Sequence, residues 1–254
     1  MCKKDSGLEN IQLNENEKKI FMRTEALIGE NALLSLKKSH VAVFGLGGVG
    51  SFVAESLARS GVGELTLVDD DAVSLSNINR QLYALQSTVG KPKVTVARDR
   101  ILDINPSIKL NLHKTFFSLE SQAEFDFSKY DYVADCIDSV KSKLLLIELC
   151  NAAGKKIISA MGAGNKLDPS CFEISDISKT SVCPLCRIMR QELKKRGISG
   201  LNVVYSKEKP VEPFYHQENL ELKAGHKAPA SIAFVPPVMG MMMAGFIIRE
   251  LGGV

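Results

Sequence analysis

The sequence predicts an α/β protein with a Rossmann-like, doubly wound and mostly parallel sheet, helices on both faces and a C-terminal α+β extension. First, short apolar runs alternate with amphipathic segments between residues 41 and 160, as parallel strands alternate with helices. Second, a glycine-rich turn joins a β-branched run, 41–44, to a segment of helical spacing, 51–60. Third, the next strand, 64–68, ends at an acidic residue, Asp69, which completes the dinucleotide-binding pattern.

The whole chain has the composition of an ordinary soluble globular protein. Its 254 residues are 45% hydrophobic and 24% charged, which suits one large domain. A net charge of +3 is too small to indicate a nucleic-acid-binding protein, so any basic surface must be local. Six cysteines do not resemble a disulfide scaffold and residues 1–10 contain no apolar signal region, so we expect a cytoplasmic protein with reduced thiols.

The chain divides into three expected segments. Residues 1–12 form a flexible tail, 13–165 hold an N-terminal helix and the nucleotide-binding core, and 166–254 extend the same domain. The extension contains a mobile loop, 206–230, and an apolar terminal helix within 232–248. Prolines and glycines interrupt this apolar tract, so it predicts a buried helix or a subunit contact rather than a membrane span, which needs about 20 apolar residues. Contact with a membrane is the minor alternative.

The remaining elements follow from apolar spacing and from turn residues. The predicted helices are 15–36 (broken at Gly29), 51–60, 90–104 (with Pro92 in its first turn), 118–127, 140–153 and 183–196. The predicted strands are 41–44, 64–68, 108–113, 132–137, 156–160, 171–177, which need not be parallel, and 201–205. The helix at 183–196 is expected to bury one face, formed by Val182, Leu185, Met189 and Leu193.

Each glycine of the turn has a physical role. Gly45 allows a tight exit from the strand, Gly47 lets a ligand approach the backbone, and Gly50 lets the helix pack on the sheet. The free N–H groups at the helix start suit a phosphate, and Asp69 can accept hydrogen bonds from a ribose hydroxyl. A tight turn without a ligand is the plainer alternative. Because both strands and the acidic residue are in place, the pattern favours nucleotide binding.

Polar loops follow the strands at the edge of the sheet where such folds bind ligands. Asp69 is followed by the loop 70–81, and the strand 132–137 delivers Asp138 to the same edge. Arg80 and Lys93 are two cations near a phosphate site. They fit a nucleoside triphosphate whose α-phosphate is attacked, since that transition state spreads negative charge. Asp138 can hold Mg²⁺, which uses one or two carboxylates together with phosphate oxygens.

Two alternatives accompany this interpretation. An isolated Arg80 or Lys93 would ordinarily be a surface charge, and only the position after the strand ends favours a functional role. A nicotinamide-binding redox or regulatory protein also carries the glycine pattern, but hydride transfer does not require these two cations. Such a protein would bind NAD and show no ATP turnover.

Five motifs stand in order within residues 20–165 and together resemble the adenylating fold of ubiquitin-activating enzymes. They are GLGGVG at 45–50, Leu67-Val68-Asp69-Asp70-Asp71, Ser76-Asn77-Ile78-Asn79-Arg80-Gln81, Gly90-Lys91-Pro92-Lys93 and Asp135-Cys136-Ile137-Asp138. The resemblance implies ATP and Mg²⁺ as cofactors, with Asp138 as the metal ligand. The candidate nucleotide-binding residues are Gly45, Gly47, Gly48, Gly50, Asp69, Asp71, Ser76, Asn77, Arg80, Gln81, Lys93, Asp138 and Ser139.

The same resemblance implies which residues take part in catalysis. The candidates are Arg80, Lys93, Asp138 and Arg23. Arg23 lies in the first helical segment, ahead of the first strand, and by itself indicates only a solvated charge. In the adenylating fold a residue at this place reaches into the ATP site of a partner subunit, which implies a homodimer.

A narrower set of motifs covers the second half of the chain. They are Asp176-Ile177-Ser178-Lys179-Thr180, Cys183-Pro184-Leu185, Val203-Val204-Tyr205-Ser206 and Ser231-Ile232-Ala233-Phe234-Val235-Pro236. These resemble the tRNA threonylcarbamoyladenosine dehydratases. The resemblance implies an enzyme that adenylates the carboxylate of threonylcarbamoyladenosine in tRNA and closes it to the cyclic form, releasing AMP and pyrophosphate. The alternative is adenylation of the C-terminal glycine of a ubiquitin-like sulfur-carrier protein, as in molybdopterin or thiamine synthesis.

The cysteines help to separate these two functions. Sulfur-carrier activators commonly hold a structural zinc with two CxxC pairs, and here Cys183 and Cys186 form one pair with no second pair downstream. Tetrahedral zinc needs four ligands, and the spacing of His216 and His226 disfavours them as the missing two. We therefore interpret both cysteines as residues at a helix start and keep a zinc site as the minor alternative.

A basic helix is the candidate contact for tRNA. Arg187, Arg190 and Lys194 recur at helical spacing and could contact phosphates, which would make binding sensitive to salt. The charge pattern alone favours a solvated helix face. The sequence leaves open whether a monovalent cation or a sulfur-relay accessory protein takes part.

Overall fold

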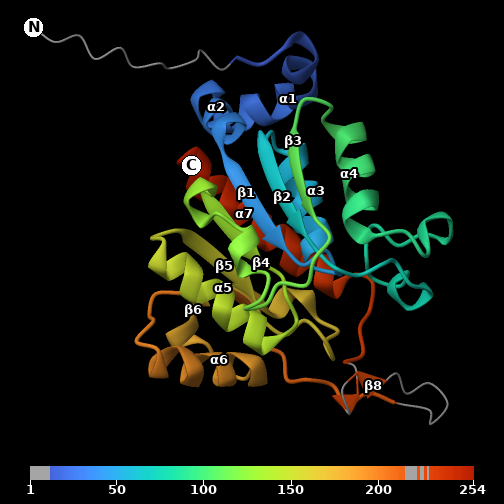
Figure 1. The fold of residues 1–254 in the computed structure, drawn as a ribbon, viewed down its shortest axis with the longest axis vertical. Helices are drawn as coiled ribbons and strands as arrows, with labels where there is room; N and C mark the ends of the chain where they lie inside the picture. The colour runs from blue at the N-terminus through green and yellow to red at the C-terminus, as the bar shows by residue number, and fades with distance from the viewer. Residues whose placement is uncertain (1–11, 215–221, 224–225, 228) are drawn as a thin grey trace, which may run out of the picture.

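The computed structural model describes residues 12–214, 222–223, 226–227 and 229–254 (Figure 1). The expected flexible tail, apart from residue 12, and His216 therefore lie outside the described residues. Within the expected loop 206–230, two short strands, β8 (Leu222–Lys223) and β9 (His226–Lys227), pair antiparallel. This segment thus contains secondary structure that the sequence did not predict.

Seven strands form one sheet in the order β3-β2-β1-β4-β5-β7-β6. They are β1 (His40–Phe44), β2 (Glu64–Val68), β3 (Lys109–His113), β4 (Tyr132–Asp135), β5 (Lys156–Ala160), β6 (Phe172–Asp176) and β7 (Asn202–Ser206). All neighbours are parallel except β6 and β7. The chain moves outward from β1 to β3 and then returns to β4 on the other side, which makes the gap between β1 and β4 a topological switch point. The predicted doubly wound α/β fold is confirmed.

Helices cover both faces of the sheet (Figure 1). On one face lie α3 (Gly50–Arg59), α4 (Lys93–Ile104) and α7 (Val235–Gly252), and on the other lies α5 (Val140–Ala152) with α6 (Pro184–Lys195) beside it. Strand β1 shows why both faces must be covered. Val41 and Val43 pack in the core under α3 and α7, while Ala42 and Phe44 pack toward α5, and all four are fully buried.

The apolar C-terminal tract forms the buried helix that was expected. Met239, Met243 and Ile247, spaced four residues apart on α7, are each 0% exposed and belong to the core on that face of the sheet. Among the helices in the described part of the chain, none is long and apolar enough to cross a membrane.

The prediction of a helix at 118–127 is wrong. The segment contains only two short 3₁₀ turns, Gln122–Glu124 and Phe127–Lys129. The Ser121 hydroxyl donates to the Phe116 carbonyl at 2.7 Å and accepts the Ser118 N–H at 3.0 Å, and such side-chain bonds compete with helical ones. Tertiary packing also decides the path of the chain, because Phe125 and Phe127 of this segment, with Phe117 just before it, pack against Phe44.

Two helix starts also differ from expectation. Val182 was expected on the buried face of α6, but it precedes the helix at φ 61° and is 48% exposed. The fully or nearly fully buried face of α6 consists of Cys186, Met189 and Leu193. Pro92 is the residue before α4 rather than part of its first turn.

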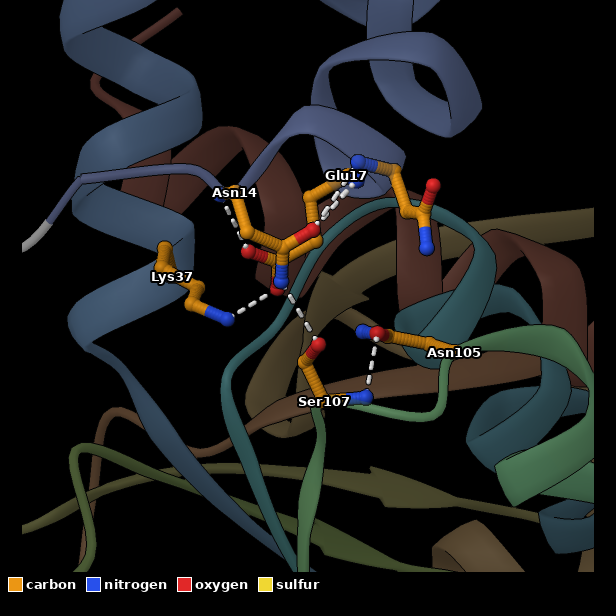
Figure 2. Close-up of polar contacts among 6 residues, drawn as sticks. Asn14, Glu17, Lys37, Asn105 and Ser107 are labelled. Atoms are coloured by element: carbon orange, nitrogen blue, oxygen red, sulfur yellow. Dashed lines mark hydrogen bonds and ion pairs between the residues drawn. The ribbon is translucent and has the colours of Figure 1, made fainter.

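The N-terminal helices α1 (Glu15–Ile28) and α2 (Glu30–Lys38) meet at Gly29, the predicted break. Asn14 caps α1: its Oδ1 accepts the N–H groups of Asn16 and Glu17, each at 3.0 Å, and the Glu17 carboxylate accepts the Asn14 N–H. The Asn14 amide also donates to Ser107 Oγ at 2.9 Å, and Lys37 of α2 pairs with Glu17 (Figure 2). This polar cluster fixes α1 to α2 and to the connection between α4 and β3.

Replacing Asn14 with alanine should lower the free energy of unfolding by about 1 kcal/mol, because the helix loses its cap. Asn14→Asp, which keeps an acceptor at the cap, should lose less. Urea unfolding measures both variants. Asn16 contributes only its backbone N–H to the cap, so Asn16→Ala serves as the control, and equal losses for Asn14→Ala and Asn16→Ala would contradict the role of the cap.

Candidate active site

A cavity of about 420 Å³ opens at the carboxyl ends of β1, β2, β4 and β5, around the switch point. Its volume suits a small-molecule ligand. Most of the predicted nucleotide-binding residues line it, although they come from loops far apart in sequence. These are Gly45, Gly47, Gly48, Asp69, Asp71, Asn77, Arg80, Gln81, Lys93 and Asp138.

Three predicted residues support the cavity without lining it. Gly50 begins α3 beneath the turn, and the Ser76 carbonyl accepts a hydrogen bond from Arg80 at 2.8 Å. Ser139 is the N-cap of α5, where its Oγ accepts the Ser142 N–H at 3.4 Å. The structure therefore gives these residues roles in holding the surrounding loops.

The glycine turn leaves no space for side chains at two positions. A Cβ on Gly45, which has φ 89°, would lie 2.7 Å from the Cys136 carbonyl oxygen. A Cβ on Gly50 would lie 1.8 Å from the Gly45 carbonyl oxygen. Glycine at both positions lets the turn fold tightly against the loop after β4, so the turn and that loop form one continuous wall.

Asp69 and Lys93 form a charged centre in the wall of the cavity. Lys93 Nζ lies 2.7 Å from Asp71 Oδ2 and 3.7 Å from Asp69 Oδ1, and the Lys93 side chain is only 5% exposed. Asp69 also accepts the backbone N–H groups of Leu46 and Asp71, at 2.6 and 2.9 Å. Burial raises the pKa of Asp69 above its ordinary value, against the opposing attraction of Lys93. A donor from a bound ligand would therefore stabilise this carboxylate.

The loop between β2 and α4 brings Lys93 to this position. Ala72 pairs antiparallel with Pro92, Val73 donates its N–H to the Lys91 carbonyl at 2.9 Å, and the Lys93 N–H bonds the Asp71 carbonyl at 3.0 Å. The loop thus folds back on itself and places the first residue of α4 beside Asp69.

Arg80 and Asn77 lie on the loop that covers the glycine turn. A Cβ on Gly48 would lie 3.4 Å from the Arg80 carbonyl oxygen, so the two segments are in close contact. One Arg80 guanidinium nitrogen donates to the Ser76 carbonyl at 2.8 Å and to Asn79 Oδ1 at 2.9 Å. These bonds orient a partly exposed guanidinium at the cavity wall.

Lys143 lines the cavity and was not predicted. It lies in α5, and its Nζ is 3.0 Å from Oδ2 of the fully buried Asp135. The signal in the sequence was a lysine inside an apolar helix, eight residues after the acidic residue that ends β4. Asp138, by contrast, is exposed at the cavity edge, where a metal ion can reach it.

A C-terminal segment closes the cavity on the side of β5. Pro229, Ser231 and Pro236 line it. Asn79 donates to the Ser231 carbonyl at 3.0 Å. The Asn165 N–H donates to the Ala230 carbonyl, and Asn165 Oδ1 accepts the Ala230 N–H, each at 2.8 Å. Sequence reasoning missed these residues, because nothing local in a proline-containing loop shows where it packs.

A model of the ThiF family matches residues 21–254. The chain belongs to the ThiF family. It is 44% identical over 238 residues to tRNA threonylcarbamoyladenosine dehydratase of Bacillus subtilis, and the match covers 91% of this chain and 94% of the relative. The crystal structure of E. coli tRNA N6-threonylcarbamoyladenosine dehydratase in complex with ATP is similar with a TM-score of 0.86 at 31% identity, covering 96% of this chain and 98% of the other.

A member of the ThiF family with the alternative activity is similar over a shorter region. Molybdopterin-synthase adenylyltransferase of E. coli is 36% identical over 152 residues, which cover 60% of this chain and 59% of the relative. The similarity to the dehydratases thus includes the C-terminal extension, whose residues 229–236 help to form the cavity.

Two groups of predicted site residues lie outside the cavity of this ThiF-family chain. Arg23 is exposed on α1. Helix α1 lies beyond the amino ends of the strands (Figure 1). On α6, Arg187 and Lys194 are exposed, whereas Arg190 is partly buried and donates to the Thr180 carbonyl at 2.9 Å. A single chain therefore does not bring Arg23 to its own cavity, and Arg190 is already engaged within the fold.

The cysteines of the CxxC pair are buried at the start of α6, as expected for helix-start residues. The neighbouring Cys186 thiol lowers the pKa of Cys183, whereas the same contact, together with burial, raises the pKa of Cys186. Across the described residues of this ThiF-family chain, no group of three or more His, Cys, Asp or Glu side chains is arranged to hold a metal ion.

Proposed function

We propose that this chain is an ATP-dependent tRNA threonylcarbamoyladenosine dehydratase of the cytoplasm. It adenylates the carboxylate of threonylcarbamoyladenosine in tRNA and closes it to the cyclic form, releasing AMP and pyrophosphate. The observation that carries the proposal is a cavity combining a glycine turn, Asp69 and the cations Lys93 and Arg80, in a chain that matches an ATP-bound dehydratase over nearly its whole length.

The geometry suits adenylation because each part of ATP has a complementary group. The glycine turn and the start of α3 offer N–H groups to the phosphates, and Asp69 offers acceptors to the ribose. Lys93 and Arg80 stabilise the charge that spreads over the α-phosphate when a carboxylate attacks and pyrophosphate leaves. The carbamoyl group of the modification then closes the ring, so no protein nucleophile is required.

Mg²⁺ fits the donor set at Asp138. This single exposed carboxylate on the cavity edge is the arrangement used by Mg²⁺ bound mainly through phosphate oxygens and water. When bound, the ion would neutralise phosphate charge. The protein contributes the Asp138 carboxylate, which lies beside the phosphate-binding turn.

Asp138→Asn should weaken activity by about 10- to 100-fold at limiting Mg²⁺, with partial recovery at high Mg²⁺, because the ligand loses its charge. The melting temperature should stay unchanged, since Asp138 is exposed. AMP formation measured over a Mg²⁺ series tests this. Asp103→Asn, at an exposed carboxylate of α4, is the matched control. A Mg²⁺ dependence equal to that of the control would exclude Asp138 as a ligand.

The decisive test of function is incubation of the purified protein with ATP, Mg²⁺ and tRNA that carries threonylcarbamoyladenosine. Nucleoside mass analysis should show loss of one water for each AMP formed. An unchanged mass would refute the dehydratase assignment. Pyrophosphate exchange triggered by a sulfur-carrier protein would instead support the alternative, and NAD binding without ATP turnover would support a nicotinamide-dependent protein.

We also propose a homodimer in which Arg23 acts in the partner's site. The exposure of Arg23 and its distance in the fold from its own cavity support this arrangement. Arg23→Ala and Lys93→Ala chains should each be nearly inactive, yet co-expressed chains should regain about one quarter of wild-type activity, since half of the dimers would then contain one complete site. Co-purification through two different tags confirms mixing. Mixed dimers without activity would rule out action across the dimer.

For the tRNA, the proposal assigns phosphate contacts to Arg187 and Lys194, the exposed cations of α6. The start of α6 adjoins the cavity through Leu185, so a tRNA whose modified base enters the cavity would pass this helix. The role of Arg190 is to hold Thr180.

A further inference from the structure

A buried ion pair borders the cavity between β4 and α5. Asp135 and Lys143 are 3.0 Å apart, and their side chains are 0% and 1% exposed. Ser159, the neighbour of Asp135 on β5, donates its hydroxyl to the same carboxylate oxygen and accepts from Lys143 Nζ at 3.3 Å. Such pairs often add little net stability, because the loss of hydration offsets the attraction. Stability alone therefore does not explain this one.

The other carboxylate oxygen of Asp135 connects the ion pair to the turn that follows β4. Its Oδ1 accepts the backbone N–H of Ile137 at 3.2 Å, in the turn 136–139 that joins β4 to α5. The backbone N–H of Lys143 bonds the Ser139 carbonyl at 2.9 Å, at the far end of the same turn. The turn is thus tied at its middle to Asp135 and at its end to Lys143, and it carries Asp138 to the cavity.

The same turn supports the glycine turn. Cys136 donates its N–H to the Phe44 carbonyl at 2.8 Å, and its carbonyl occupies the space that a Cβ on Gly45 would need. A shift of the turn 136–139 would therefore move both Asp138 and one wall of the phosphate-binding turn. Groups that bind a metal or a phosphate from a loop depend on this kind of support.

We propose that Asp135, Lys143 and Ser159 are positioning residues that fix the turn 136–139 for binding of Mg²⁺·ATP. The inference rests on the proposed use of ATP and names residues that act behind Asp138. None of the three needs to contact the reacting atoms. Their charges and hydroxyl instead set the position of the turn that bears the metal ligand.

The test removes the charges without leaving one of them unpaired. Lys143→Met alone leaves the buried Asp135 charge without its cation and should lower the melting temperature by about 10 °C or more. In Asp135→Asn/Lys143→Met both charges are gone and the volume is kept, so the melting temperature should return to within about 4 °C of wild type. The Asp135→Asn change also replaces the oxygen that accepts the Ser159 hydroxyl with a nitrogen that must donate, so the side chain that holds the Ile137 N–H loses its support from β5.

Calorimetric titration with ATP, with and without Mg²⁺, provides the functional readout. In the double variant the Mg²⁺-dependent gain in ATP affinity should fall about 10-fold or more, although the fold is restored. A double variant with both wild-type melting temperature and wild-type Mg²⁺ dependence would show that the pair is purely structural and would overturn the proposal.

If the double variant does not fold, Ser159→Ala tests whether these residues position the turn 136–139. It keeps both charges, removes one donor to Asp135, and should reduce the same Mg²⁺-dependent gain several-fold. An unchanged gain would overturn the proposal. Lys156→Met is the control, because it removes a lysine that is 59% exposed and pairs with Glu250 at 3.0 Å, away from the cavity. Failure of the dehydratase assignment would appear separately, as wild-type protein that binds Mg²⁺·ATP normally but leaves the tRNA unchanged.

Discussion

Lys93→Ala should slow adenylation by about 100-fold or more, equivalent to about 2.7 kcal/mol of lost transition-state stabilisation. Lys93 is suited to this role, because its side chain is 5% exposed and its ammonium lies between Asp69 and Asp71. A cation fixed before the reaction needs no reorganisation when charge develops on the phosphate. Its loss also removes the cation that attracts Asp69 and Asp71 beside the triphosphate, so ATP affinity should fall as well.

Pyrophosphate exchange in the presence of modified tRNA measures this effect. Lys93→Met, which keeps the aliphatic stem, should be as impaired as the alanine variant, since the missing charge is the cause. Lys109→Ala is the matched control, because Lys109 is 68% exposed on β3 and pairs with Glu64 at 2.9 Å, outside the cavity. An exchange rate for Lys93→Met within about threefold of the control would contradict the electrostatic role.

Arg80→Ala should also slow adenylation by about 100-fold, for a related but distinct reason. The Ser76 carbonyl and Asn79 Oδ1 accept hydrogen bonds from the guanidinium, and these bonds fix the orientation of its planar group. Arginine can bind phosphate through two parallel hydrogen bonds, which lysine cannot reproduce. Arg80→Lys should therefore recover only a small part of the lost rate.

Single-turnover formation of AMP separates this loss from slower product release. Because Arg80 is partly exposed, the alanine variant should melt at the wild-type temperature. Arg98→Ala, at an exposed arginine that pairs with Asp99 on α4, provides the control. Full recovery of the rate in Arg80→Lys would mean that charge alone matters at this position and would refute bidentate recognition.

Three features could be predicted from the sequence: the strand–turn–helix unit around Gly45 and Gly50, the alternation of strands and helices, and the acidic residue at the end of β2. These features follow from local rules: apolar spacing fixes which face is buried, and glycine marks turns without space for a side chain. The carboxyl ends of parallel strands meet at one edge, so the sequence could also place Asp69 and Asp138 near a common ligand.

The rest of the site is assembled by contacts that form when the elements of the fold pack together. The pairing of Ala72 with Pro92 sets Lys93 beside Asp69, and Asn79 holds Ser231, a residue 152 positions away, at the cavity wall. The aromatic packing of Phe44 against Phe117, near the helix expected at 118–127, is likewise a contact between distant segments. Such contacts depend on which surfaces meet after the chain has folded, and local spacing carries no information about them.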